Sequence, residues 1–431
     1  MILTFPYDTT YLKLEVEESL VKAVLTPPIH DYEVKKSESE LVSEALLHPI
    51  GSPSLMELAR GKEHILIITS DHTRPVPSQI TLPLLLKEIR STAPKAQVKI
   101  LIATGMHRPM SEAEMIARFG KNIVKKEELI NHISRNSDEM VYKGMLPSGA
   151  ALYLNQLVDW ADLTIAEGFI EPHFFAGYSG GRKAVLPGIA SEQTVRENHC
   201  SAFIRDPQAI AGSLEENPLH KDMLVAAKAA KLAFILNVVL DSEKKIVAAF
   251  AGDSEKAHSA GCTFLQKLAW VKKTPADIII STNGGAPLDQ NLYQAVKGMT
   301  AAELCARQDS VIIMIASCVD GHGSEGFYQY FKKAKSPADV LAKIEATKQS
   351  DTVTDQWEAQ ILARILVKNP VILVGDPKIK AICEDMFMQY APTLDEALAL
   401  ARSMTRQQAT ITAIPDGVSV IVTDTIRLLP K

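Results

Sequence analysis

The sequence lacks several features that would indicate a particular class of protein. Its five cysteines are scattered and form no Cys-x-x-Cys pair, so neither a disulfide framework nor a zinc ribbon is indicated. Lysine and arginine number 46 against 51 aspartates and glutamates, and the net charge of -5 argues against nucleic acid or anionic lipid as a partner. No apolar run approaches the roughly 18 residues of a membrane span. Small molecules and other proteins are left as the expected partners.

The beginning of the chain, MILTFPYDTTYLKLEVEESL, has no basic segment followed by a long apolar one, unlike a secretory leader. We therefore expect a cytoplasmic protein whose cysteines are reduced and buried. A length of 431 residues with 46% hydrophobic side chains is sufficient for a sizeable core and for two domains.

Short apolar runs alternate with helical patterns along the chain. The runs end in polar or glycine-rich turns, as buried parallel strands do, and cover residues 64–71, 97–105, 162–169, 276–285, 310–317, 370–376 and 418–424. The helical patterns cover residues 81–91, 111–120, 220–232, 336–349 and 393–404. This alternation predicts an α/β fold.

Residues 236–253 interrupt the alternation with two β-like runs around DSEKK, which predicts an antiparallel hairpin at the end of one unit. A long helical pattern follows over residues 255–273, and then a new series begins with a strand. We therefore predict two α/β domains with largely parallel sheets, residues 1–270 and the smaller 271–431, whose last residues could pack back on the first domain. The cleft between two such domains is a common ligand site.

Reactive side chains cluster where four of the predicted strands end. HILIITSD leads into HTRPVP, QVKILIATG into MHRP, DLTIAEGF into IEPHFFAGYSGGRK, and ADIIISTNGG into APLDQNLYQAVKG. Ligands of open α/β sheets bind beyond the carboxyl ends of the strands, so these segments bring polar groups to one edge. The groups are Asp71, Thr73, Arg74, His107, Arg108, His173, Lys183, Gln294 and Lys297.

Three histidines, His107, His173 and His199, lie in loops marked by glycine or proline or near the start of a helix. A single histidine at a strand end is more often structural than catalytic, but three together favour a function. Their separations of 66 and 26 residues match no local metal motif, so a three-histidine zinc site is open but not indicated.

The segment GYSGGRKAV, residues 177–185, has glycines that would let backbone N–H groups approach an anion. It has neither the Walker A spacing, since Arg182 stands where a glycine belongs, nor the Gly-x-Gly-x-x-Gly pattern of a dinucleotide fold. Lys183 is then the informative residue. A lysine in such a tight loop can have a lowered pKa and act as a nucleophile or as a covalent anchor for a cofactor; the alternative is a solvated surface lysine.

Arg74, Gln294 and Lys297 suggest an anionic substrate. Arginine offers two parallel hydrogen bonds to a carboxylate, and Gln294 and Lys297 are three residues apart on a helix-like segment, so they point the same way. Each of them alone is also typical of a surface. Trp357 fits either a packing position or a pocket wall.

Five ordered motifs, DHTRP (71–75), GMHRP (105–109), EPHFFAGYSGGRK (171–183), NHC (198–200) and YQAVKG (293–298), resemble those of the nickel-dependent lactate racemase family. The resemblance implies an isomerase that interconverts the D and L forms of a small 2-hydroxy acid, with lactate favoured and another 2-hydroxy acid as the alternative. It also implies a nickel pincer nucleotide, the nickel complex of pyridinium-3-thioamide-5-thiocarboxylic acid mononucleotide, attached covalently at Lys183.

The same resemblance implies roles for the other residues. His199 would be the protein ligand to nickel, and His107 and His173 the paired acid and base. The remaining implied roles are substrate contacts for Arg74, Gln294 and Lys297, pocket lining for Tyr293 and Trp357, and organisation of the cofactor or substrate for Asp71 and Thr73. Transient contact with the enzymes that make the cofactor is also expected.

The chemistry of racemisation agrees with this scheme. Removal of the α-proton would place charge beside an ionised carboxylate, and a histidine with a pKa of about 6.5 is too weak a base for that. If the α-hydrogen leaves as hydride, imidazole need remove only the hydroxyl proton. Return of the hydride to either face of the planar 2-oxo acid gives either enantiomer, so two bases are needed.

Two other hypotheses stay open from the sequence. A lyase-type enzyme would use the amine of Lys183 to form a Schiff base, with histidines as proton shuttles and no nickel. A carrier protein would hold an anionic nucleotide in the cleft without turnover.

Overall fold

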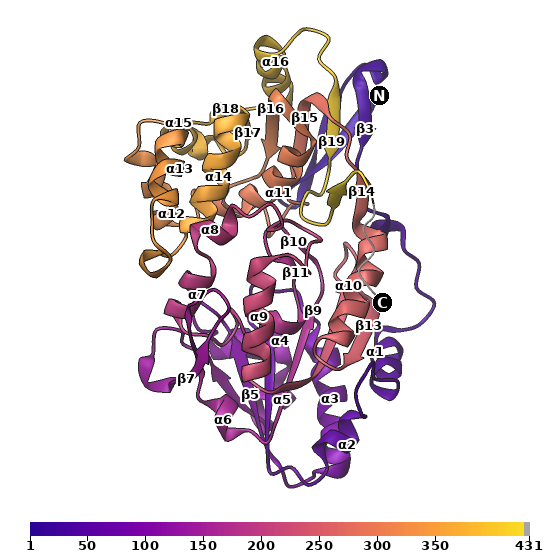
Figure 1. Cartoon of the computed structure of the whole chain (residues 1–431). Helices are drawn as coiled ribbons and strands as arrows, with labels where there is room; N and C mark the ends of the chain where they lie inside the picture. Colours follow the sequence, from indigo (N-terminus) through magenta and orange to yellow (C-terminus); the bar gives the residue numbers. More distant parts are fainter. Residues whose placement is uncertain (426–431) are drawn as a thin grey trace.

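The computed structural model describes residues 1–425, which form two α/β units, one above the other in Figure 1. The first unit is built on a six-stranded sheet of order β13-β12-β9-β4-β5-β6. Its strands are β4 (His64–Ser70), β5 (Gln97–Ala103), β6 (Glu128–Asn131), β9 (Leu163–Phe169), β12 (Leu232–Leu240) and β13 (Ile246–Gly252). All neighbours are parallel except β12 and β13, which confirms the predicted antiparallel hairpin.

The second sheet, of order β18-β17-β16-β15-β19-β3, is parallel throughout. Its strands are β3 (Val21–Val24), β15 (Ala276–Thr282), β16 (Ala306–Ile315), β17 (Val371–Val374), β18 (Gln389–Ala391) and β19 (Ile411–Ile414). The predicted α/β class with two domains and largely parallel sheets is therefore confirmed. The strand β3 belongs to this sheet although its residues fall within the predicted domain 1–270, because it pairs with β19.

Helices flank the two sheets. Those of the first unit are α1 (Glu38–Leu47), α2 (Leu55–Ala59), α3 (Ser78–Thr92), α4 (Glu112–Phe119), α5 (Lys121–Lys126), α6 (Leu157–Trp160), α7 (Glu192–Asn198), α8 (Ser201–Ile204), α9 (Pro218–Ala229) and α10 (Lys256–Ala269). Those of the second are α11 (Leu292–Cys305), α12 (Glu325–Lys332), α13 (Pro337–Glu345), α14 (Gln356–Lys368), α15 (Lys380–Asp385) and α16 (Leu394–Met404). Each of the predicted helical patterns, including the one over residues 255–273, overlaps one of them. No helix within residues 1–425 combines the length and apolar character needed to cross a membrane.

Small two-stranded pairs complete the fold. They are β1 (Ile2–Tyr7) with β2 (Thr10–Glu15), β7 (Met140–Met145) with β8 (Ala151–Asn155), β10 (Pro172–His173) with β11 (Gly177–Tyr178), and β14 (Trp270–Lys272) with β20 (Ile421–Thr423). The predicted strand 418–424 is thus the short β20, outside the second sheet. Ile421 packs with Ile170 and Tyr178 of the first unit, so the chain returns toward that unit at this point.

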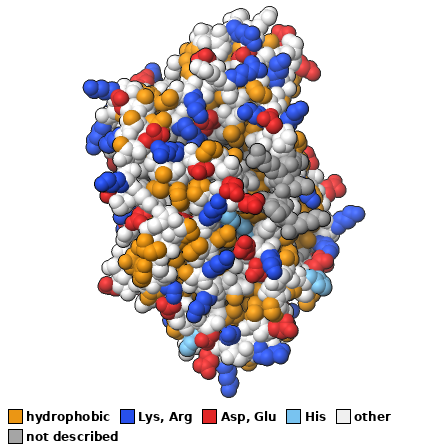
Figure 2. Space-filling model, in the orientation of Figure 1, with side chains coloured by type: hydrophobic (Ala, Val, Ile, Leu, Met, Phe, Trp, Pro, Cys, Tyr) orange, Lys and Arg blue, Asp and Glu red, His pale blue; other side chains and the backbone are white. Residues whose placement is uncertain are grey.

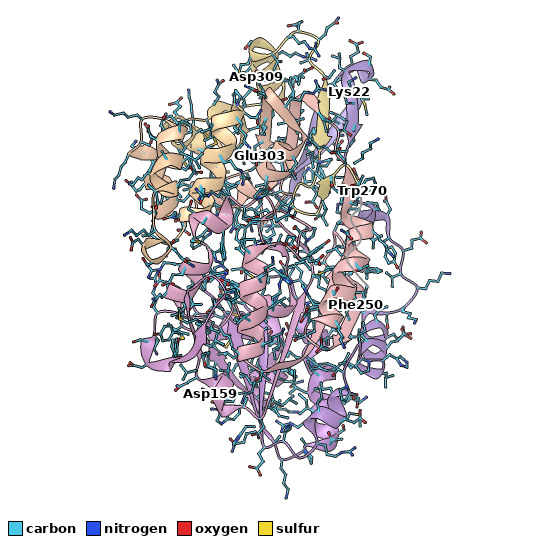
Figure 3. The ribbon with its side chains drawn as sticks, in the orientation of Figure 1. Lys22, Asp159, Phe250, Trp270, Glu303 and Asp309 are labelled. Carbon is cyan, nitrogen blue, oxygen red and sulfur yellow. The ribbon has the colours of Figure 1, made fainter. Side chains whose placement is uncertain are left out.

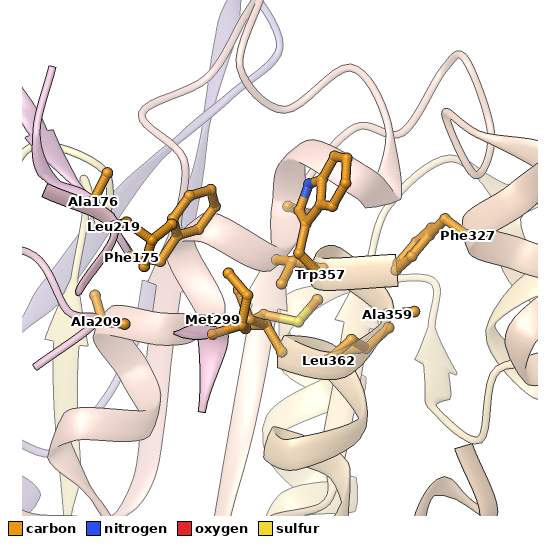
Figure 4. Packing of buried hydrophobic residues seen from close by; sticks show 14 of the residues in the cluster. Phe175, Ala176, Ala209, Leu219, Met299, Phe327, Trp357, Ala359 and Leu362 are labelled. Atoms are coloured by element: carbon orange, nitrogen blue, oxygen red, sulfur yellow. The ribbon is translucent and has the colours of Figure 1, made fainter. Parts of the chain in front are cut away.

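The apolar runs predicted as strands are buried on both faces. In β4, Ile65 and Ile67 belong to one apolar core, while Leu66 and Ile68 belong to another. The second of these cores continues into the other unit: Figure 4 shows Phe175 and Leu219 of the first unit near Met299, Trp357 and Leu362 of the second. Burial of one such large side chain contributes about 1.5–3 kcal/mol, so this shared core holds the two sheets together. The five cysteines are free and buried, as expected.

The surface is mixed in charge. On the face shown in Figure 2, blue and red side chains are interspersed and no broad basic area is visible. This pattern agrees with the net charge of -5.

Candidate functional site

The carboxyl ends of three neighbouring strands form the floor of the candidate site. The adjacent strands β9, β4 and β5 lead into the loops that carry His173, Asp71 to Arg74, and His107. The second unit contributes the first turns of α11 and α14. Three of the four segments expected at one edge meet there because their strands are parallel neighbours, whereas the fourth follows β15 of the second sheet.

His107 is oriented by a buried carboxylate. Its Nδ1 lies 2.7 Å from Oδ2 of Asp71, which is 1% exposed, and the hydroxyl of Thr73 donates to the other oxygen at 2.6 Å. Burial alone would raise the pKa of Asp71, but the hydrogen bond and charge of His107, with help from Thr73 and Arg74, lower it to about 2. Asp71 is therefore ionised, and it accepts the Nδ1 proton of His107. The lone pair of the neutral imidazole is then on Nε2.

His173 has the opposite arrangement. The backbone N–H of Ala176 donates to its Nδ1 at 3.2 Å, so the proton of the neutral ring is on Nε2. Burial lowers the pKa of His173 well below its usual value, and the charges of Lys183 and Lys297 lower it further. Its ring stacks on Phe174 with centroids 5.1 Å apart. The two predicted acid/base histidines thus differ in tautomer and in charge environment.

Lys183 lies in a short 3-10 turn, Gly181–Ala184, that two glycines make possible. Gly180 has φ 81°, and a Cβ there would lie 2.8 Å from the carbonyl oxygen of Phe169. The side chain of Lys183 is half-buried. Burial lowers its pKa well below the usual value, and the neighbouring Arg182 acts in the same direction. A lowered pKa favours the uncharged amine, which is the nucleophilic form.

Arg182 is the residue of this loop that sequence reasoning treated only as a break in a phosphate-loop pattern. It is 1% exposed and donates 2.8 Å hydrogen bonds to the carbonyls of Ala176 and Tyr178. A third bond of 2.9 Å goes from Nε to Nδ1 of His220. These bonds fix the loop around Lys183.

His199 ends α7 and is 5% exposed. Its Nδ1 donates a hydrogen bond of 2.9 Å to the carbonyl oxygen of Val195. The neutral ring therefore carries its proton on Nδ1 and its lone pair on Nε2. Burial, followed by the charge of Lys183, lowers the pKa of His199 to about 3. A neutral imidazole whose other nitrogen is anchored to a carbonyl is the usual form of a metal ligand. The rings of Phe175 and Trp357 lie 5.3 and 5.0 Å away.

The second unit supplies the predicted substrate contacts. Nζ of Lys297 donates to Oε1 of Gln294 at 2.6 Å, and the indole N–H of Trp357 donates to the hydroxyl of Tyr293 at 3.1 Å. Burial lowers the pKa of Lys297 to about 8, and the charge of Arg74 contributes to the same effect. The last observation places Lys297 and Arg74 within electrostatic reach of each other, as expected for two cations that share one anion.

Glu358 was missed by sequence reasoning. It is 1% exposed in the first turn of α14, and no described residue donates a hydrogen bond to its Oε1. Burial raises its pKa to about 8, while Lys297 acts to lower it. The sequence contains no signal for this burial, because an acidic residue in the first turn of a helix is usually exposed to solvent.

A cavity of about 250 Å³ lies between the two units. Its lining includes Thr73, Arg74, His173 and Lys297, together with Glu303 and other residues of the second unit. Glu303, labelled on α11 in Figure 3, binds Arg364 of α14 at 2.7 and 3.1 Å. His107 is linked to this cavity through its neighbour Thr73, whereas Lys183, His199, Tyr293 and Trp357 are not among its lining residues. A cleft between the two units is present, and the predicted site residues that line it are Thr73, Arg74, His173 and Lys297.

The described residues do not form a complete metal-binding site by themselves. In the part of the chain that the structure describes, no group of three or more histidine, cysteine, aspartate or glutamate residues is arranged to hold a metal ion. A metal bound through His199 would therefore take its other ligands from a second molecule.

Comparison with known proteins gives matches over nearly the whole chain. Residues 7–212 match the model of the lactate racemase N-terminal domain, and residues 271–422 match that of the lactate racemase C-terminal domain. The chain is 55% identical over 417 residues to a lactate racemase of Thermoanaerobacterium thermosaccharolyticum and 50% identical over 417 residues to one of Lactiplantibacillus plantarum. Each match covers 97% of this chain and 98% of the relative.

Solved structures agree with these matches. The structure of the lactate racemase apoprotein from Thermoanaerobacterium thermosaccharolyticum superposes with a TM-score of 0.95 at 54% identity, covering 98% of this chain and all of that one. A protein from Thermotoga maritima has a TM-score of 0.66 at 18% identity, covers 91% of this chain and all of its own, and shows the fold alone.

Proposed function

Because this chain belongs to the lactate racemase family of isomerases, we propose that it interconverts D- and L-lactate, with a nickel pincer nucleotide at Lys183 as acceptor and donor of the α-hydrogen. The observation that carries the proposal is a pair of histidines held in opposite tautomers, together with a lysine whose pKa is lowered by burial. His107 has its lone pair on Nε2, whereas His173 has its proton there. Such a pair suits a reaction in which one proton leaves and another returns.

The residues present fit this cofactor. Burial lowers the pKa of Lys183, and an amine with a lowered pKa is suited to a covalent bond with a carboxyl-type carbon. His199 has the fixed tautomer and the Nε2 lone pair of a metal ligand. A single protein ligand is enough if the nucleotide supplies the remaining donors, in keeping with the sparse metal ligands among the described residues.

The substrate would be held by its carboxylate. Arg74 and Lys297 line the cavity together, and two cations in a partly desolvated site bind a small anion well. Lys297 is oriented by Gln294, and the Phe174 ring lies 6.0 Å from its Nζ. The apolar ring beside the cations leaves space for a small aliphatic side chain rather than a charged one.

The proton steps follow from the hydrogen bonds. Nε2 of His107 accepts the hydroxyl proton of one enantiomer, and Asp71 stabilises the imidazolium that results. His173 serves the opposite enantiomer and donates from Nε2. After burial, the charges of Lys183, Lys297 and Arg74 lower its pKa, and a substrate carboxylate bound by Lys297 and Arg74 would offset part of that effect.

Loss of Arg74 is expected to weaken substrate binding more than turnover. In Arg74→Gln the KM for lactate should rise about 10- to 100-fold, because a charge-assisted contact present in both the ground state and the transition state is removed. Steady-state kinetics in both directions give the split between kcat and KM. The matched control is Arg135→Gln, which removes a mostly exposed arginine paired with Glu192. An unchanged KM in Arg74→Gln would place the carboxylate elsewhere.

Loss of Glu358 is expected to shift the pH dependence of KM. The carboxylate of Glu358 raises the pKa of Lys297, which burial and Arg74 hold at about 8. In the wild type KM should rise as the pH increases through that value, because an uncharged amine attracts the substrate less. In Glu358→Gln the rise should occur at lower pH. A KM profile from pH 6 to 9, with the exposed Glu345→Gln as control, measures the shift, and coincident profiles would remove Glu358 from the site.

The proposed reaction is tested by the fate of the α-hydrogen. With cofactor-loaded protein and L-lactate deuterated at C2, the D-lactate formed should keep the deuterium, because the hydrogen is transferred within the site. Chiral chromatography with mass detection reports both the racemisation and the label. Wash-out of the label into water would contradict hydride transfer, and absence of D-lactate would contradict lactate as the substrate.

A further inference from the structure

Asp355 precedes α14 in a backbone conformation that is rare at the start of a helix. Its φ of 67° and ψ of 0° lie in the left-handed region that favours glycine. A polar residue in this place is normally extended and accepts a hydrogen bond from its own first turn, as Ser324 does for α12. Within the described part of the chain, the carboxylate of Asp355 makes no such bond to the first turn of α14. Its oxygens are therefore free to contact other elements.

The carboxylate of Asp355 joins the starts of three helices. The hydroxyl of Ser324, before α12, donates to Oδ2 of Asp355. The hydroxyl of Tyr293, in the first turn of α11, forms a hydrogen bond with the same carboxylate. Burial raises the pKa of Tyr293 well above its usual value, the charges of Glu358 and Asp355 raise it further, and this hydrogen bond acts in the same direction. Tyr293 is therefore a neutral phenol that donates its proton to Asp355.

Tyr293 transmits this contact to Trp357. The phenol oxygen accepts the indole N–H of Trp357 at 3.1 Å. Trp357 is 8% exposed, and the centre of its ring lies 5.0 Å from that of His199, which belongs to the first unit. Because the phenol proton is given to Asp355, a lone pair of the oxygen can face the indole. The direction of donation thus runs from Trp357 to Tyr293 to Asp355.

The backbone around Trp357 is held separately from its indole ring. Two hydrogen bonds tie the start of α14 to α7 and α8 of the first unit, and neither involves the indole. They run from Oγ1 of Thr354 to Oε1 of Glu192 at 3.1 Å, and from Nε2 of Gln360 to the carbonyl of Ser201 at 3.0 Å. The orientation of the indole therefore depends on Tyr293 and, through it, on Asp355.

We propose that Asp355 is a positioning residue of the active site, which orients the phenol of Tyr293 and through it holds the indole of Trp357 against His199. The proposal rests on the proposed function only for the role of His199 as a metal ligand. A packed indole limits the rotation of the imidazole, and groups around a ligand set its orientation. This task explains a carboxylate where glycine would fit the backbone better, because strained conformations persist where other contacts require them.

Two-dimensional proton–nitrogen NMR of protein with isotope-labelled tryptophan tests the orientation without any turnover. The chain has three tryptophans, and Trp357→Phe identifies the indole resonance of interest. In Asp355→Gly this resonance should shift, because the phenol loses its acceptor, while those of Trp160 and Trp270 stay in place. Tyr293→Phe should shift the same resonance, because it removes the acceptor of the indole itself.

Two further variants separate orientation from stability. Asp355→Asn tolerates the left-handed backbone and keeps a carbonyl acceptor, so the Trp357 resonance should stay near its wild-type position. Ser324→Ala removes the cap of α12 and the other hydrogen bond to Asp355, so it should lower the melting temperature and leave the Trp357 resonance in place. An equal shift of that resonance in Ser324→Ala and Asp355→Gly would assign Asp355 a structural role and overturn the proposal.

Steady-state kinetics of cofactor-loaded protein give the consequence for the reaction. Asp355→Gly should lower kcat about 10- to 100-fold, because a small misplacement of groups around the reacting atoms slows the chemistry. The KM for lactate should change less, because Arg74 and Lys297 are untouched, and Ser324→Ala should keep the wild-type kcat.

Two other outcomes would also overturn the proposal. An unshifted Trp357 resonance in Asp355→Gly would mean that Asp355 does not orient the indole. A shifted resonance with the wild-type kcat would mean that this orientation has no part in the reaction. Because the NMR experiment needs no racemisation, a failure of the proposed function would be seen separately in the deuterium experiment.

Discussion

Lys183→Ala is expected to lose the covalent cofactor and with it all racemase activity. Alanine has no amine, and the loop that holds Lys183 offers no second one: its neighbour Arg182 is protonated and committed to backbone carbonyls and His220. Mass spectrometry of the peptide that spans residues 177–188, with nickel analysis of the intact protein, measures the loss. The exposed Lys221→Ala, which breaks only a surface pair with Glu216, is the matched control.

A normal nickel content together with racemase activity in Lys183→Ala would contradict the anchor role. Nickel retained without activity would mean that His199 holds the metal independently of the lysine. Borohydride treatment of the wild type with pyruvate adds a second test, because reductive trapping at Lys183 would favour a Schiff-base enzyme.

His107→Ala and His173→Ala are each expected to lower the rate of racemisation about 10²- to 10⁴-fold, with the cofactor still attached. The reason is that each imidazole serves one enantiomer, so removal of either one blocks the full cycle. In a single turnover each variant should convert only one enantiomer of lactate to the 2-oxo acid. Rapid-quench assays from D- and L-lactate separately measure this selectivity.

The control for the histidine variants is His48→Ala, which removes an exposed imidazole after α1. Near-normal racemisation in His107→Ala or His173→Ala would remove the two-base assignment. Equal loss for both enantiomers in single turnovers would assign a structural role to the histidine concerned.

The main features of the fold could be predicted from local pattern. β4 and β9 are runs of apolar residues that end in turns, and such runs are buried on both faces of a parallel sheet. β3 could not be predicted in this way. It is four residues long with an alternating, half-exposed pattern, and its partner β19 lies about 390 residues further along the chain. Pairing over such a distance depends on the tertiary fold and leaves no local pattern.

The site divides in a similar way. His107, His173 and Lys183 stand out because glycine- or proline-marked loops follow strands. Glu358 does not, because a charged residue on a helix usually faces water, and only the packing of α14 buries it. The sequence identifies the candidate histidines, but it does not predict which ring nitrogen of each carries the proton.

The tautomers come from contacts across the fold. Asp71 lies 36 positions before His107, and the N–H that binds Nδ1 of His173 belongs to the turn between β10 and β11. The prediction placed Asp71 and Thr73 with the cofactor or substrate. Their hydrogen bonds go to each other and to His107, and the role toward cofactor or substrate stays a prediction. This arrangement makes them positioning residues for the base.

The most direct test of the account is the mass of the Lys183 peptide, with nickel content, in wild-type protein produced together with the cofactor-making enzymes. We expect a mass increment confined to that peptide and an equimolar amount of nickel bound to the protein. Absence of both, when the same enzymes load a known lactate racemase, would contradict it and favour an enzyme that uses the free amine of Lys183.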